Sequence, residues 1–135
     1  MTLTPNFLLV GSIVEYNGAP CIVIEILRNN CIATVGNSGH ISEFNGIPLT
    51  PEILTEWCNA KKWGRDDMPR TISYDFGFIQ IFPANSFCDF EGYGFMHYKP
   101  NENELTESAR VVIHYLHELQ LLFLGFKTVL PITIK

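Results

Sequence analysis

Closely spaced turn signals in residues 1–48 constrain the fold most, because they leave room only for short strands joined by tight turns. Asn17-Gly18 is the strongest of these signals, since both residues tolerate the positive φ that a type I′ hairpin turn requires. The return strand is expected in residues 20–27, and further turns at 29–30 and 37–39 separate two more strands. The sequence therefore predicts an N-terminal antiparallel meander, curled into a small SH3-like barrel.

The predicted return strand is rich in isoleucine. Strict alternation places Ile22, Ile24 and Ile26 on one face and Val23 on the other, because successive side chains of a strand point to opposite faces. Across the chain 47% of residues are apolar, 13% are aromatic and only 17% are charged, so we expect a substantial core. The same richness leaves apolar side chains for an exposed patch used in self-association.

A helix start follows this meander. Thr50 suits the N-cap position, Pro51 suits the first helical position, where no N–H is needed, and Glu52 suits the positive end of the helix. We expect the helix to end near Trp63 and a charged loop to occupy residues 65–70.

A second set of strand candidates, separated by turn residues, lies in residues 71–75, 78–82, 87–90 and 95–98. A C-terminal helix is expected within residues 110–125, where four apolar side chains recur at helical spacing: Val112, Leu116, Leu119 and Phe123. Residues 110–113 also suit a strand. Residues 129–134 are expected to add an edge strand. The prediction is one α+β domain over residues 1–135, in which residues 49–135 hold a helix, a second antiparallel meander and a C-terminal amphipathic helix.

The net charge and the cysteine pattern limit which classes of partner and which cellular compartment we expect for this protein. Nine basic against fourteen acidic residues give a net charge of −5, which disfavours broad nucleic-acid binding. No apolar run approaches the ~18 residues that cross a bilayer, and no signal-peptide pattern precedes the first strand, so no membrane association is expected. The cysteines lack C-x-x-C pairing and fit buried thiols in a reducing cytoplasm: Cys21, Cys31, Cys58 and Cys88.

Three segments resemble a family of small, uncharacterised proteins of phages, prophages and mobile elements of gut bacteria. Residues 46–54, GIPLTPEIL, are similar to the family's I-P-L-T-E-E-W-L segment, and residues 115–123, YLHELQLLF, are similar to its Y-V-H-Q-L-Q-N-L-Y. Residues 9–14 more weakly resemble its L-R-I-G-N-x-V start. Glu118 and Leu121 depart from the family pattern, so the helix is more apolar here. The resemblance implies an accessory protein of a mobile element and no particular chemistry.

Polar residues within the C-terminal helix are the first candidates for a site. His114 and His117 are spaced i, i+3, whereas zinc helices place ligands at i, i+4, and no third ligand is apparent, so we expect no metal and no cofactor. The structural interpretation of His117 is a buried side chain that hydrogen-bonds the backbone of residues 47–50. The functional one is ligand contact by His117 together with Gln120.

These observations leave three candidate functions, because the sequence contains no recognisable set of catalytic residues that would favour one of them. The first is a non-catalytic accessory protein that binds another protein or itself. The second is a protein that binds or sequesters a small ligand, such as a signalling nucleotide, in a cleft edged by these candidate residues: Trp63, Arg110, Tyr115, His117 and Gln120. The third is a hydrolase that uses His117 with a carboxylate, which is disfavoured because its neighbour Glu118 points about 100° away on a helix.

Overall fold

A computed structural model describes residues 8–84, 91–98, 105–107 and 112–135 of the chain. The chain divides into two compact units. Unit 1 comprises residues 1–48 and 115–130, and unit 2 comprises residues 49–114 and 131–135. The boundary after residue 48 coincides with the predicted end of the first meander, but the C-terminal helix belongs to unit 1. No helix in the described parts is long and apolar enough to span a bilayer.

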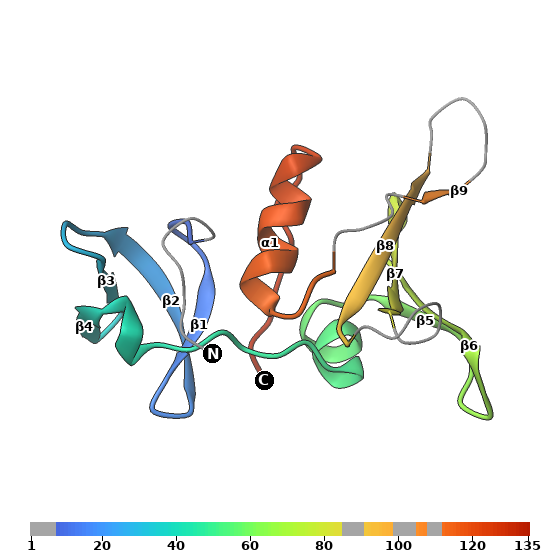
Figure 1. Ribbon diagram of the computed structural model, residues 1–135, viewed down its shortest axis with the longest axis horizontal. Coiled ribbons are helices and arrows are strands. Elements are labelled where there is room, and N and C mark those ends of the chain that lie inside the picture. The colour runs from blue at the N-terminus through green and yellow to red at the C-terminus, as the bar shows by residue number, and fades with distance from the viewer. Residues whose placement is uncertain (1–7, 85–90, 99–104, 108–111) are drawn as a thin grey trace. The chain divides into compact units, whose positions relative to one another are not determined.

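Unit 1 contains a four-stranded antiparallel sheet in the order β1-β2-β3-β4 (Figure 1). Its strands are β1 (Ile13–Tyr16), β2 (Ala19–Ile26), β3 (Cys31–Thr34) and β4 (Asn37–His40). The predicted hairpin is confirmed, because Asn17 and Gly18 have φ angles of 49° and 81° between β1 and β2. The N-terminal meander predicted from the turn signals is therefore present.

The first sheet is not closed into a barrel. A short 3₁₀ helix, Ile41–Glu43, follows β4 and returns the chain to β1. There the Glu15 and Asn45 backbones exchange two hydrogen bonds, of 2.8 and 2.9 Å. Because this contact is a single bridge and β1 has no ladder with β4, the SH3-like barrel is not confirmed.

A β-bulge in β2 corrects the predicted pattern of its isoleucines. Val23 lies opposite Thr34, but Glu25 lies opposite Ala33, so Ile24 is an extra residue on this strand. The register change places Ile26 opposite Ile32, whose side chain is in the core. Strict alternation had predicted that Ile22 and Ile26 lie on the same face. The bulge places them on opposite faces instead.

The core of unit 1 lies against one face of this sheet. Its buried cluster joins apolar side chains of the strands and the connecting segments: Leu8, Val14, Val23, Ile32, Ile41 and Phe44. The helix α1 (Leu116–Gly125) contacts β1 and buries Leu116, Leu119 and Phe123, three members of the predicted apolar stripe. The predicted C-terminal helix is thus present, although residues 112–115 are extended and α1 begins only at Leu116.

The first helix of unit 2 starts as predicted but ends early. The Thr50 Oγ1 accepts the Ile53 N–H at 3.1 Å, which confirms the predicted cap. Helical turns cover residues 51–57, of which Ile53–Trp57 form a π-helix. Asn59 then adopts a φ of +60°, a left-handed conformation that ends a helix, so the predicted extension to Trp63 is wrong.

Unit 2 contains a five-stranded antiparallel sheet in the order β5-β6-β7-β8-β9. Its strands are β5 (Lys61–Arg65), β6 (Met68–Asp75), β7 (Ile79–Pro83), β8 (Tyr93–Tyr98) and β9 (Leu105–Glu107). The second meander is therefore present. Its most buried side chains include Tyr74, Ile79 and Ile81.

Three details of unit 2 differ from the prediction. The charged loop expected at residues 65–70 is a hairpin whose turn is Asp66-Asp67. Residues 129–134 form no strand, although the Thr133 N–H donates to the Trp57 carbonyl at 2.9 Å. The strand candidate at residues 87–90 lies outside the described residues.

Candidate functional site

The predicted ligand-binding residues fall into different parts of the fold. Tyr115, His117 and Gln120 lie together in unit 1, immediately before or within the first turns of α1. Trp63 lies on β5 in unit 2, and Arg110 lies outside the described residues. The structure therefore brings together three of the five within one unit.

Gln120 connects α1 to the beginning of the first sheet. Its Oε1 accepts the Ile13 N–H at 2.8 Å, and its Nε2 donates to the Gly11 carbonyl at 2.9 Å. One amide thus satisfies a donor and an acceptor of backbone more than 100 residues away in the sequence. Because both ends of the amide are engaged, the arrangement gives Gln120 an architectural role.

His117 is enclosed rather than presented to a ligand. Only 3% of the residue is exposed, and its ring stacks on Tyr115 with centroids 5.8 Å apart. The burial that the structural interpretation expected is present, but among the described residues Nδ1 has no hydrogen-bond partner. Burial lowers the pKa of His117, and the nearby charge of Glu118 opposes that shift. The ring is therefore held in its neutral form.

Gly46 permits this stacked arrangement. A Cβ at position 46 would lie 2.7 Å from Cδ1 of Tyr115 and 3.0 Å from Cε1 of His117. The next residue, Ile47, accepts the Leu116 N–H at 2.9 Å, which fixes the first residue of α1. The motif regions 46–54 and 115–123, noted from the sequence, thus meet through their first residues.

Trp63 is accessible, and 48% of it is exposed. Lys61 Nζ lies 4.2 Å from the ring centroid, and the indole Nε1 donates to Asp75 Oδ2 at 3.3 Å. A strand places Lys61 and Trp63 on one face because they are two residues apart, whereas the predicted helix would have separated them. The indole is therefore a half-covered surface group on the outermost strand.

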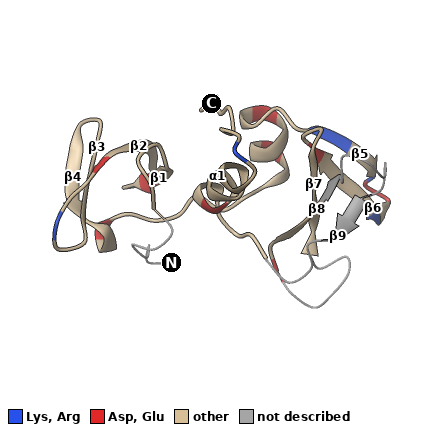
Figure 2. Cartoon of the chain, turned by 90° about the horizontal axis from the view of Figure 1, so that it is seen from above, with Lys and Arg blue, Asp and Glu red and all other residues tan. Residues whose placement is uncertain are grey.

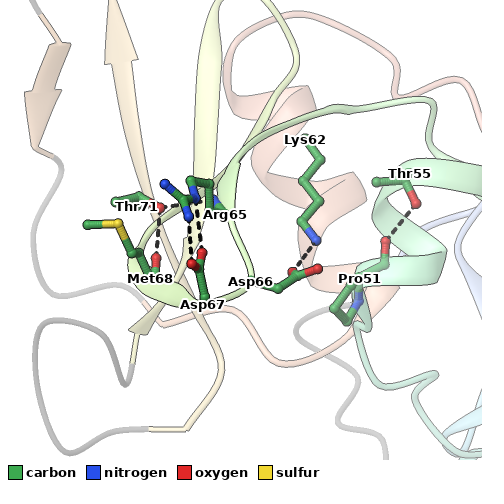
Figure 3. Close-up of polar contacts among 8 residues, drawn as sticks. All are labelled: Pro51, Thr55, Lys62, Arg65, Asp66, Asp67, Met68 and Thr71. Atoms are coloured by element: carbon green, nitrogen blue, oxygen red, sulfur yellow. Dashed lines mark hydrogen bonds and ion pairs between the residues drawn. The ribbon is translucent and has the colours of Figure 1, made fainter.

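Two of the three basic residues on β5 are paired with carboxylates. β5 carries Lys61, Lys62 and Arg65, and its basic stretch is blue beside the label β5 in Figure 2. Lys62 pairs with Asp66 at 2.6 Å, and Arg65 pairs with Asp67 through two contacts of 2.6 and 3.0 Å; both pairs are drawn in Figure 3. These pairs reduce the positive field that phosphate binding would need.

An apolar hollow in unit 1 is a feature that sequence reasoning missed. Its volume is about 140 Å³. It lies between the turn at residues 9–12, α1 and the segment after α1. The described residues that line it are all uncharged: Leu9, Val10, Gly11, Ser12, Gln120, Leu121, Leu124, Val129 and Leu130. Two rim residues are unusually accessible, with 65% of Val10 and 76% of Val129 exposed. The available sequence signal was Val10-Gly11, an apolar residue before a turn glycine with a φ of +97°.

Two exposed isoleucines of β2, Ile22 and Ile24, lie next to residues whose backbones are hydrogen-bonded to residues of the hollow. Ile22 lies opposite Ile13, whose N–H is bound by Gln120, a residue of the hollow. The Gly11 N–H donates to the Val23 carbonyl at 2.7 Å, next to Ile24. We call the exposed apolar side chains of this region the apolar strip: Leu9, Val10, Ile22, Ile24, Leu124 and Val129.

No cluster of three or more His, Cys, Asp or Glu side chains suited to a metal occurs among the described residues. Cys58 is buried, and this burial raises the pKa of its thiol to about 12, which suits packing and not nucleophilic attack. The chain matches no protein-family model, no curated protein and no solved structure. The function must therefore be argued from the site itself.

Proposed function

We propose that this protein is a non-catalytic interaction module that binds a protein partner through the apolar strip of unit 1. The observation that carries the proposal is the set of exposed apolar residues that line the hollow, with Ile22 and Ile24 on the neighbouring strand β2: Leu9, Val10, Leu124 and Val129. Apolar side chains that are exposed next to one another often mark a protein interaction surface, whereas single exposed apolar residues are normal. The resemblance of residues 46–54 and 115–123 to proteins of phages and mobile elements supports an accessory role in the cytoplasm. The bridge from Glu15 to Asn45 supports an SH3-like arrangement of unit 1.

The hollow specifies the chemistry of the partner. A volume of about 140 Å³ is close to that of an engineered apolar cavity of about 150 Å³ that binds benzene. It therefore accommodates one side chain of the size of leucine or phenylalanine. Because the described lining residues are uncharged and mostly apolar, we expect the inserted group to be apolar.

The exposed area sets the strength of the complex. Complete burial of an exposed Val, Leu or Ile side chain contributes about 1.5–3 kcal/mol. The six side chains of the strip are between 39% and 76% exposed, which corresponds to about three complete side chains and therefore to about 5–9 kcal/mol. Association costs about 4–15 kcal/mol, so the strip supports a weak, reversible complex unless the partner adds further contacts.

The two alternative functions receive less support. Sites for small molecules usually occupy about 300–1,000 Å³, so the hollow is too small for a signalling nucleotide. A hydrolase would need His117 to reach a substrate, but the ring is enclosed and held neutral between Tyr115 and Gly46. A nucleotide panel in a thermal-shift assay tests the first alternative, since a ligand at 100 times its Kd adds about 2.7 kcal/mol of stability.

Selection from a displayed peptide library tests the proposed function. We expect the selected peptides to share one aromatic or long aliphatic anchor without adjacent charges. Replacing Val10 with Glu should weaken their binding at least tenfold, because the carboxylate would enter the apolar rim. Val35→Glu is the matched control, since Val35 also precedes a turn glycine with positive φ and is 73% exposed, but lies outside the strip.

Two results would contradict the proposal. One is equal loss of peptide binding in Val10→Glu and Val35→Glu, and the other is the absence of any peptide that requires the strip. Light scattering coupled to gel filtration distinguishes a second copy of the chain from another protein as the partner. A dimer that Val10→Glu dissociates would identify self-association.

A further inference from the structure

We propose that His117 forms an acid-sensitive latch that docks the start of α1 on residues 46–48, and that its protonation releases this end of the helix. The inference does not depend on the proposed function. It concerns a conformational equilibrium within unit 1, to which both segments belong.

The docked contact is small and local. The Leu116 N–H donates to the Ile47 carbonyl at 2.9 Å, and Pro48 forms an isolated antiparallel bridge with Tyr115. The Tyr115 and His117 rings cover Gly46, where even a methyl group would collide with them. One buried ring therefore sits at the centre of the joint between α1 and this segment.

The position of His117 suits a neutral ring only. Protonation gives the imidazole a donor at both nitrogens, but Nδ1 is buried and the described part of the chain offers it no acceptor. His117 is also the second residue of α1, so a positive charge there meets the positive end of the helix dipole. Burial and helix polarity thus act in the same direction against the charged form.

The ionisable groups around the latch do not supply the missing acceptor. Among the described residues, Glu118 is the charged group that acts on the ring, and Tyr115 is the titratable side chain stacked on it. Glu118 favours the charged ring through space, but its Oε1 accepts the Tyr115 N–H at 3.0 Å. Desolvation is the larger effect, and the pKa of His117 lies below its usual value of 6.5.

The direction of the pH effect follows from this shift. Well above pH 6.5 the ring is neutral in both the docked and the released states, so docking is unaffected. As the pH falls below 6.5, the released and hydrated ring binds a proton before the docked ring does. Docking therefore weakens by up to about tenfold for each unit by which the docked pKa is lowered.

Hydrogen exchange of the full-length chain at pH 7.5 and pH 5.5 tests the latch. After correction for the intrinsic exchange rate, we expect the Leu116 amide to lose at least threefold of its protection at pH 5.5. The Ile32 amide in the first sheet should be unchanged. His117→Phe keeps an aromatic ring and removes the titration, so its Leu116 protection should be the same at both pH values.

Two controls keep the experiment decisive. His40→Gln removes the exposed histidine of the same unit and should retain the wild-type pH response. If His117→Phe does not fold, the His117 ring signal of the wild-type chain is followed by NMR, and its midpoint should match the loss of Leu116 protection. Unchanged Leu116 protection, an equal response in His117→Phe, or mismatched midpoints would overturn the proposal.

Discussion

Replacing Gly46 with Ala tests how tightly the start of α1 packs against unit 1. The new Cβ would lie 2.7 and 2.8 Å from Cδ1 and Cγ of Tyr115, and 3.0 Å from Cε1 of His117. These atoms belong to rings that are themselves stacked, so neither can move without disturbing the other. Overpacking of this kind costs about 1–3 kcal/mol.

The loss of conformational freedom in the unfolded chain partly offsets the packing cost of Gly46→Ala. Gly46 does not have a positive φ, so an alanine there also restricts the unfolded chain and gains about 0.4–1 kcal/mol. The net expectation is a loss of about 1–2 kcal/mol in the free energy of unfolding. For a chain of this length, that corresponds to a decrease of roughly 3–8 °C in Tm.

Urea unfolding followed by circular dichroism measures this loss. Gly125→Ala is the matched control, because nothing lies within 4 Å of its Cβ position and Gly125 also lacks a positive φ. At the last residue of α1 this change should stabilise by about 0.5–1 kcal/mol through helix propensity. If Gly46→Ala proved as stable as Gly125→Ala, the argument for close ring packing at Gly46 would be refuted.

Two further substitutions test other joints of the fold. Gln120→Ala should destabilise unit 1 by about 1–3 kcal/mol in the same urea assay, because it removes both hydrogen bonds to the backbone of residues 11–13; an unchanged midpoint would show that water replaces them without loss. Gly64→Ala should destabilise unit 2 by more than 2 kcal/mol, because its Cβ would collide with the Thr71 carbonyl in a residue with a φ of +93°. Gly77→Ala has a similar φ but open space around it, so a loss there as large as at Gly64 would exclude the collision as the cause.

The local features of the fold were predictable because neighbouring residues determine them. Asn17-Gly18 fixes a hairpin through its own backbone preferences, and Thr50 caps the helix that immediately follows it. The apolar spacing within α1 likewise appears as buried residues at the expected positions. Both antiparallel meanders follow from such turn signals, which act over a few residues.

The features that failed to follow from the sequence depend on contacts between distant residues. Lys61–Arg65 suits the end of a helix by composition, but its pairing with β6 makes it a strand. The bulge at Ile24 places Ile26 on the face opposite to the one predicted for it, and it arises from the register between β2 and β3. No pattern within either strand specifies that register.

The candidate site also has features that the sequence predicted and features that depend on contacts between distant residues. The sequence by itself identified His117 and Gln120 as polar groups beside an apolar stripe. Only the tertiary structure decided that Gln120 binds the backbone at residues 11–13, that Nδ1 of His117 is buried with no partner among the described residues, and that Val10 borders a hollow. The physical reason is that hydrogen bonding and burial are properties of atoms brought together from opposite ends of the chain.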